Sequence, residues 1–332
     1  MNILISGGLG FIGAHTAVEL IEAGHHIHII DNLANAEVEV LDHIEKITGV
    51  KPAFDKIDCQ NKHELHESLK DEPFDGIIHF AAFKAVGESV EQPLKYYENN
   101  LNSTINLAEF AIKKNINSFV FSSSATVYGD QPSPFVETMA LMPPSNPYGA
   151  TKQMSEQILS DVSKAHSKFN VTLLRYFNPV GAHPSGLIGE SPRGIPNNLM
   201  PYILDVASKK RDFLSVYGDD YPTKDGTGIR DYIHVVDLAK AHVRAIETMI
   251  QPINIYNVGT GQGSSVLDVI KTFEAVNHVK IPYKIVDRRP GDIAVSYANA
   301  DKIHQELGFK TELTLEDMVK DAWHFTTQSK GI

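Results

Sequence analysis

The sequence of 332 residues contains one cysteine and no long apolar run. The lone Cys59 excludes an internal disulfide framework and suits a reducing compartment, so we expect a cytoplasmic protein. No stretch is apolar for long enough to cross a bilayer. The N-terminus lacks the positive region of a signal peptide and reaches Gly7 after only six residues. The sequence therefore predicts a chain with no membrane partner.

Basic residues are outnumbered by acidic ones, and the formal net charge is -11. This balance argues against a nucleic-acid partner, because binding to phosphate polymers depends on Lys and Arg. A small anionic ligand held by local arginines is still compatible with this net charge. The spacing of His63 and His66 suggests a metal site, but the segment is polar, helical in pattern and without a third ligand nearby. We predict a solvent-exposed helix there, and no metal site in the chain.

Short apolar runs alternate with amphipathic stretches over about the first 175 residues, as in strand–helix units around a parallel sheet. The predicted strands cover 3–6, 26–30, 53–57, 76–81, 118–122 and 171–175. From 177 to about 229 the chain is rich in Pro, Gly and Asn, which predicts loops and short helices that build a pocket. Strand patterns return at 232–235 and 253–259, with a helix between them.

These patterns predict an α/β fold: a Rossmann-type doubly wound parallel sheet with a smaller α/β C-terminal substrate domain. The length favours one large domain and a smaller companion. We place 1–176 plus about 232–260 in the larger domain, and about 177–231 plus 261–332 in the smaller one. The two domains would then interleave in sequence.

A glycine-rich run follows the first predicted strand directly. Gly7, Gly10 and Gly13 are spaced as Gly-x-x-Gly-x-x-Gly and open a predicted helix over 11–23, which Gly24 ends. Glycine permits a tight turn, a close approach of the backbone to a pyrophosphate, and close packing of the helix on the strand. The helix N-terminus would face the anion. We predict a dinucleotide site here.

The end of the second predicted strand indicates which dinucleotide binds. Asp31 stands there, where its carboxylate can accept hydrogen bonds from the adenosine ribose. Its neighbour is Asn32 and not arginine, so a 2′-phosphate would meet negative charge, and we predict NAD rather than NADP. Asp58 and Cys59 follow the third strand, where an adenine would lie. The Cys59 side chain is expected to act as a small apolar group.

A tyrosine and a lysine stand one helical turn apart after the fifth strand. Asn146 is a candidate N-cap and Pro147 the first helical residue, so Tyr148 and Lys152 should share a face. A phenol with a pKa of roughly 10 is a poor base at neutral pH, and lowering that pKa by about three units takes on the order of 4 kcal/mol. An ammonium, a helix N-terminus and a charged nicotinamide ring would all favour the phenolate. We therefore predict a lowered pKa for Tyr148 and a role as the base.

The fifth strand ends in three serines, at the edge of the sheet where open α/β proteins bind ligands. Ser124 can share the proton of a substrate hydroxyl with Tyr148. The candidate catalytic residues are Tyr148, Lys152 and Ser124. A Tyr-x-x-x-Lys pair alone also fits a surface helix, but the serine-ended strand and the glycine run at proper intervals favour catalysis.

These motifs and several longer strings resemble the extended short-chain dehydrogenase/reductase family, and within it the branch that epimerises sugar nucleotides. The strings cover 84–89, 122–130, 174–184, 195–201 and 225–234, and the match spans nearly the whole chain. The resemblance implies tightly bound NAD in the larger domain and a UDP-hexose in the smaller one. It implies inversion of the 4-hydroxyl of UDP-glucose or UDP-galactose through a 4-keto intermediate, in galactose metabolism.

The resemblance also implies which residues bind each ligand. For NAD they are Gly7, Gly10, Phe11, Ile12, Gly13, Asp31, Asn32, Asn35, Asp58, Cys59, Phe80, Ala81, Lys84, Asn99, Ser122, Tyr148, Lys152 and Phe177. For the UDP-sugar they are Lys84, Ser124, Tyr148, Phe177, Asn178, Asn198, Leu199, Val216, Tyr217, Arg230, Arg289, Asp292 and Ser296. Forked arginine donors can neutralise the diphosphate, and asparagine side chains suit the uracil or ribose.

Two alternatives to epimerisation stay open on sequence alone. Sugar-nucleotide dehydratases and decarboxylases begin with the same oxidation, but the acidic residues that follow their strand-five hydroxyl correspond here to Ala125 and Thr126. A non-catalytic NAD-binding regulator would need neither Tyr148 and Lys152 nor a diphosphate pocket.

Two further expectations concern the sugar and the oligomer. Some family members carry a bulky aromatic residue at the position of Ser296, beside the sugar's C2 substituent, and serine would leave volume for an N-acetyl group. We hypothesise activity on UDP-GlcNAc and UDP-GalNAc as well. The resemblance also implies a homodimer, for which the sequence offers amphipathic helices at 101–113 and 152–164.

Overall fold

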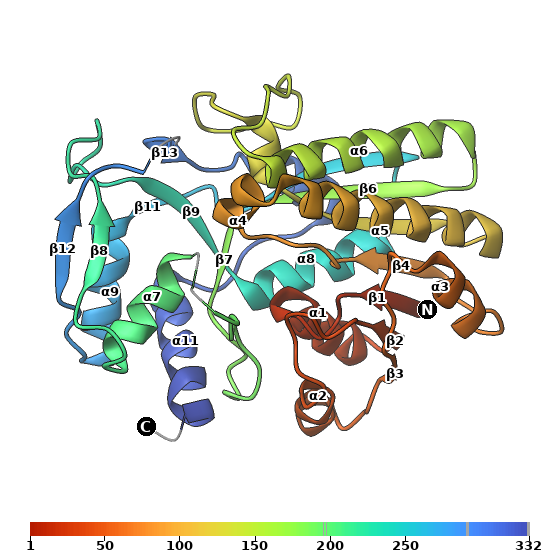
Figure 1. Cartoon of the computed structure of the whole chain (residues 1–332), viewed down its shortest axis with the longest axis horizontal. Helices are drawn as coiled ribbons and strands as arrows, with labels where there is room; N and C mark the ends of the chain where they lie inside the picture. Colours follow the sequence, from red (N-terminus) through yellow and green to blue (C-terminus); the bar gives the residue numbers. More distant parts are fainter. Residues whose placement is uncertain (195, 197, 290–291, 331–332) are drawn as a thin grey trace.

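The computed structural model describes residues 1–194, 196, 198–289 and 292–330, and its larger sheet has seven parallel strands (Figure 1). Their order is β10-β6-β5-β4-β1-β2-β3. The strands are β1 (Asn2–Ser6), β2 (His26–Ile30), β3 (Ala53–Asp55), β4 (Gly76–His79), β5 (Ser118–Ser124), β6 (Asn170–Tyr176) and β10 (Ile253–Val258). The order runs outward from β1 in both directions, which is the predicted doubly wound Rossmann-type arrangement.

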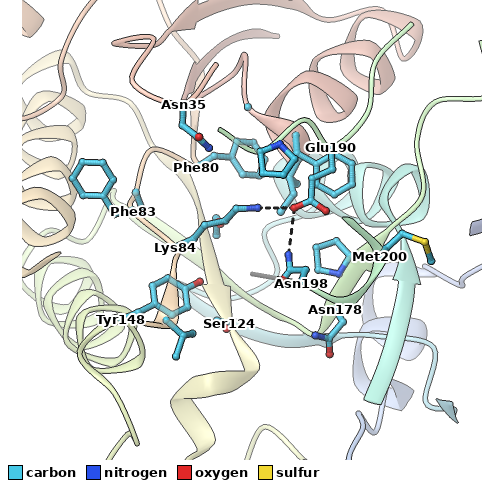
Figure 2. A pocket seen from close by; sticks show the side chains of 18 of the residues that line it. Asn35, Phe80, Phe83, Lys84, Ser124, Tyr148, Asn178, Glu190, Asn198 and Met200 are labelled. Carbon is cyan, nitrogen blue, oxygen red and sulfur yellow. Dashed lines mark hydrogen bonds and ion pairs between the residues drawn. The ribbon is translucent and has the colours of Figure 1, made fainter. Parts of the chain in front are cut away.

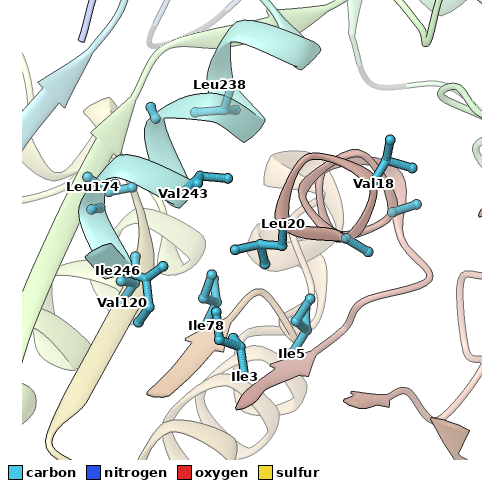
Figure 3. Close-up of a cluster of buried hydrophobic side chains, with 14 of the residues drawn as sticks. Ile3, Ile5, Val18, Leu20, Ile78, Val120, Leu174, Leu238, Val243 and Ile246 are labelled. Atoms are coloured by element: carbon cyan, nitrogen blue, oxygen red, sulfur yellow. The ribbon is translucent and has the colours of Figure 1, made fainter. Parts of the chain in front are cut away.

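Helices cover both faces of this sheet. One face carries α1 (Phe11–Glu22), α2 (Val40–Thr48) and α8 (Val235–Glu247), and the other carries α3 (Lys62–Ser68), α5 (Pro93–Lys114) and α6 (Pro147–Ala165). Alternate strand residues serve the two faces: Ile3 and Ile5 pack toward α1 and α8 (Figure 3), whereas Leu4 packs with the other core cluster. Burial on both faces explains why the strands are almost continuously apolar.

The turn between β1 and α1 requires glycine at two positions. Gly7 has φ +70°, and a Cβ there would lie 2.7 Å from the backbone N of Ala81. A Cβ at Gly13 would lie 2.3 Å from the backbone O of Gly7. A side chain at either position would displace backbone, so the close packing predicted for the glycine run is present.

The remaining strands form smaller sheets. In the first, β9 (Ile229–His234) pairs with β7 (Asn178–Val180), β11 (Gly263–Ser265) and β13 (Val295–Ser296), and in the second β8 (Leu214–Tyr217) pairs with β12 (Tyr283–Val286). The helices α7 (Leu199–Ala207), α9 (Val266–Asn277) and α11 (Leu315–Lys330) pack beside them around a core that contains Ile203, Phe273 and Val319. Short elements complete the fold: α4 (Val86–Glu91), the 3₁₀ turn η1 (Ala125–Tyr128) and α10 (Asp301–Leu307).

One strand lies elsewhere than predicted. Of the segment of about 232–260 that we assigned to the larger domain, residues 232–234 belong to β9, and β9 pairs with β7 in register Asn178↔Tyr232. Because β7 leaves the larger sheet directly after β6, its partner β9 belongs to the smaller sheet. Among the described residues, β10 returns to the larger sheet as a strand, and α8 and α10 pack against that sheet. The boundaries of the two domains stay a prediction.

The predicted strand ends also shift by a few residues. β4 stops at His79 rather than 81, because the backbone N–H groups of Phe80 and Ala81 both donate to the carbonyl of Ser6, at 2.9 and 3.1 Å. β5 instead continues to Ser124, which pairs with Tyr176 of β6. No helix in the described part of the chain is long and apolar enough to cross a membrane.

Candidate active site

A cavity of about 610 Å³ opens at the carboxyl ends of the parallel strands. All eighteen residues predicted for NAD line it, and so do the residues predicted for the UDP-sugar apart from Ser296. Ser296 is buried on β13, with its Cα opposite that of the cavity-lining Arg230, so the structure brings it next to the wall but not into it. The motif at 195–201 falls partly outside the described residues, since 195 and 197 are not described.

One part of the cavity has the features of a dinucleotide site. Asp31 is buried and accepts hydrogen bonds from the backbone N–H groups of Leu33 (2.9 Å) and Leu9 (3.2 Å). Burial raises the pKa of Asp31, while these two hydrogen bonds oppose the rise. The Asn32 side chain donates to Asp58 at 3.2 Å. A carboxylate fixed in this way still has lone pairs that can accept from a ribose.

The N-terminus of α1 lies in the same part. Gly10, Phe11, Ile12 and Gly13 line the cavity, and the first turn of α1 has no acidic residue and no side-chain cap. Its backbone N–H groups and the positive end of the helix dipole are therefore available to an anion. Together with the glycine turn that a Cβ would block, these residues fit the pyrophosphate of NAD.

Tyr148 and Lys152 come from the first turns of α6. The Asn146 side chain accepts from the backbone N–H of Gly149 at 2.9 Å and Pro147 begins the helix, so the predicted cap is present. Lys152 Nζ lies 5.9 Å from the centre of the Tyr148 ring and donates to the carbonyl of Ser122 at 2.6 Å. The predicted lysine–tyrosine pair thus lies at the serine-ended edge of β5. Figure 2 shows Tyr148 beside Ser124.

The lowered pKa that we predicted for Tyr148 includes the charge of a bound nicotinamide ring and stays a prediction. Among the protein's own groups, burial raises the Tyr148 pKa to about 12, although a hydrogen bond with Ser124 opposes the rise. Burial likewise lowers the pKa of Lys152 to about 7, against the attraction of Glu156. A lysine with such a pKa is only partly charged at neutral pH, so Lys152 offsets little of the desolvation of Tyr148. A lowered Tyr148 pKa therefore requires an added positive charge.

Another part of the cavity gathers cationic side chains. Arg230 forms an ion pair with Asp292, and its guanidinium also donates to the carbonyl of Ile229 at 2.8 Å. The Arg289 guanidinium lies 3.9 Å from the centre of the Tyr217 ring. Two forked cations that line one cavity suit a diphosphate.

Glu190 is a cavity residue that the sequence analysis missed. Its carboxylate pairs with Lys84 Nζ at 3.1 Å and accepts from the Asn198 side chain at 3.3 Å, so it joins the loop after β4 to the segment before α7 (Figure 2). The predicted pocket-building segment 177–229 contains Glu190, but nothing in its spacing singles this carboxylate out. Among the residues that the structure describes, no group of three His, Cys, Asp or Glu side chains could hold a metal ion.

Comparison with known proteins identifies the family. The model of the NAD dependent epimerase/dehydratase family matches residues 3–259. The chain belongs to this family. The UDP-glucose 4-epimerase of Bacillus subtilis (strain 168) is 50% identical over 332 residues, which are 99% of this chain and 98% of that protein. The resemblance drawn from the motifs is confirmed.

Solved structures of the epimerase/dehydratase family share the whole fold. The UDP-glucose-4-epimerase of Stenotrophomonas maltophila, with bound NAD and formylated UDP-arabinopyranose, has a TM-score of 0.97 and 45% identity and covers 100% of both chains. The UDP-glucose 4-epimerase of Bifidobacterium longum, in complex with NAD+ and UDP, has a TM-score of 0.96 and 47% identity and covers 99% of both chains. The predicted fold class is confirmed.

Tyr148 is expected to stay protonated at about pH 9 in protein stripped of nucleotide. Burial penalises the phenolate and holds the pKa at about 12, so no phenolate forms until the pH rises well above its ordinary midpoint of about 10. A phenolate absorbance titration should therefore superimpose for wild type and Tyr148→Phe up to about pH 9. An excess of one phenolate in the wild type below that pH would contradict this account.

Proposed function

We propose that the chain catalyses the reversible 4-epimerisation of UDP-glucose and UDP-galactose with NAD retained in the site. The observation that carries the proposal is that Tyr148 and Lys152 share one cavity with a glycine-rich helix N-terminus and two arginines. The relatives described above support it, since they are named as UDP-glucose 4-epimerases and two of them hold NAD. The roles of the individual residues are part of the proposal.

The chain's own residues handle the proton of the reaction. Bound NAD supplies the acceptor for the hydride of C4 and afterwards its donor. Tyr148 accepts the proton of the 4-hydroxyl as the C4–H bond breaks, which leaves a 4-keto sugar, and it returns the proton when C4 is reduced. Ser124, within hydrogen-bond reach of the Tyr148 hydroxyl, shares that proton. The Lys152 ammonium favours the phenolate.

The diphosphate part of the cavity holds the substrate between the two half-reactions. Arg230 and Arg289 bind the diphosphate through charge-assisted hydrogen bonds, so the keto sugar stays attached through its UDP. The hexose turns about the phosphate linkage and presents its opposite face to the hydride. Oxidation and reduction at the same carbon cancel, so no net redox change occurs.

The end of β5 disfavours the related elimination reactions. Ala125 and Thr126 stand where dehydratases would need an acid/base pair, and the Thr126 hydroxyl donates to Ser124 at 3.0 Å. A non-catalytic NAD-binding regulator would not require Tyr148 and Lys152 in the cavity that contains the dinucleotide site. Epimerisation accounts for this tyrosine–lysine pair and for the non-acidic residues Ala125 and Thr126.

We also propose a cytoplasmic homodimer that acts in galactose metabolism. The helices α4, α5 and α6 lie next to one another (Figure 1), and several large apolar side chains on them are exposed, which supports the dimer. Val90 is 61% exposed, Leu94 80% and Met154 45%. Burial of such a surface against a second copy would be favourable.

The purified protein should convert UDP-galactose to UDP-glucose without added NAD, as followed by proton NMR. Tyr148→Phe is expected to lower kcat by about 10²–10⁴-fold, because the base is lost, with KM and NAD content near wild type. Tyr283→Phe is a matched control, since Tyr283 is exposed on β12 outside the cavity. A wild type that binds NAD but yields no UDP-glucose would refute the proposal.

We propose that the protein also acts on UDP-GalNAc, because the residue beside Arg230 is the small Ser296. Ser296→Tyr should lower kcat/KM for UDP-GalNAc by about tenfold or more relative to UDP-galactose, since an aromatic ring would compete for the space of the N-acetyl group. Ser296→Ala should behave as wild type. If wild type and Ser296→Ala both fail to turn over UDP-GalNAc, the hypothesis is wrong.

A further inference from the structure

A buried ion pair lies next to the catalytic lysine. Glu156 on α6 is 4% exposed and Arg175 on β6 is 3% exposed. Arg175 Nη2 donates to one carboxylate oxygen at 2.6 Å and Arg175 Nε to the other at 2.9 Å. The pair is therefore a forked, fully buried contact between α6 and the sheet.

The same carboxylate also holds the end of β5. Ser123 Oγ donates to it at 2.5 Å. Ser123 stands between Ser122, whose carbonyl accepts from Lys152, and Ser124, which lines the cavity. Glu156 follows Lys152 by one helical turn, so a single carboxylate fixes this face of α6 to both β5 and β6.

Stability alone does not explain a charged pair at this position. Transfer of two charges from water to the interior costs free energy, and two apolar side chains of similar volume often pack as stably or better. Arg175 also contacts the Tyr128 hydroxyl at 3.1 Å and stacks over its ring at 4.9 Å, so the pair is held in one geometry. These contacts are those expected of an ion pair that places a charge at a fixed position.

The groups around the Lys152 ammonium show which charge acts on it. Its own helix contributes Tyr148 and Glu156, β4 contributes His79, and β5 contributes the Phe121 ring, whose centre lies 4.7 Å from Nζ. From β6 come Arg175 and Tyr176, whose hydroxyl bonds Ser122. Burial lowers the pKa of His79 to about 3 and raises that of both tyrosines, so these three groups are uncharged near neutral pH. Among the described residues around Lys152, Glu156 supplies the negative charge.

We propose that Glu156 and Arg175 are a positioning pair for Lys152: the carboxylate, one helical turn from Lys152, ties this face of α6 through Ser123 to the end of β5 where Ser122 holds the lysine, and the arginine holds the carboxylate. The inference rests on the proposed function, in which Lys152 favours the phenolate of Tyr148. Neither Glu156 nor Arg175 lines the cavity, so neither is expected to touch substrate or cofactor.

Glu156→Gln tests the role of the charge, because it keeps the shape of the side chain. In protein labelled with ¹³C at the lysine ε-carbon, the Lys152 resonance is assigned by its loss in Lys152→Met, and its titration is followed by NMR. Glu156→Gln should lower the Lys152 midpoint by roughly one pH unit, and the alkaline limb of kcat should move with it while KM stays near wild type. Glu306→Gln is the matched control: Glu306 accepts from the Tyr256 hydroxyl at 2.8 Å outside the cavity and should leave both curves in place.

Arg175→Lys keeps the charge of Glu156 but loses part of the packing around it, so it separates the effect of the charge from the effect of packing. It is also the test to use if Glu156→Gln does not fold. It leaves the carboxylate with fewer donors, so the Lys152 midpoint should stay at or above that of wild type while kcat falls. A midpoint below wild type in Arg175→Lys, or an unchanged midpoint in folded Glu156→Gln, would overturn the inference. Wild-type turnover of UDP-galactose reports separately on the proposed function, because the NMR titration needs no substrate.

Discussion

The site depends on the parallel alignment of β1, β4, β5 and β6. Because these strands point the same way, their carboxyl ends meet at one edge of the sheet. The glycine turn after β1, the Lys84 loop after β4 and the serines of β5 are thereby brought to one cavity, although they are far apart in sequence. The apolar packing of both faces against helices keeps this edge in place. β7, which follows β6 directly, leads the chain toward the smaller sheet in which β9 carries Arg230.

Electrostatics in the cavity are set mainly by burial. Tyr148 is harder to ionise than free tyrosine and Lys152 is harder to protonate than free lysine, so the protein alone does not prepare the base. A positive nicotinamide ring next to the phenol would supply the missing charge, which ties the activation of Tyr148 to the presence of oxidised cofactor. Burial lowers the pKa of Lys152, whereas Glu156 raises it. Because Glu156 is also paired with Arg175, the same carboxylate attaches α6 to the sheet.

Predictions that rested on local chemistry agree with the structure, and so does the doubly wound fold, but some features that depend on distant contacts were missed. The glycine turn, the Asn146 cap and the strand positions follow from backbone geometry and short-range patterns, and each is present as predicted to within a few residues. β9 pairs with β7 across a long connection. No local sequence pattern indicates which strands meet across such a distance. Glu190 becomes a cavity residue only where two distant loops approach. The effect of burial on the Tyr148 pKa could not be predicted, because desolvation depends on the surrounding fold rather than on the Tyr-x-x-x-Lys spacing.

The central claim is that one hydride leaves C4 of the sugar and returns to it inside a single cavity. Turnover of UDP-galactose deuterated at C4, in ordinary water and with unlabelled NAD in solution, tests this most directly. The account predicts UDP-glucose with the deuterium still at C4, because the hydride never leaves the protein. Loss of the label to water, or its appearance in the free NAD pool, would contradict the account.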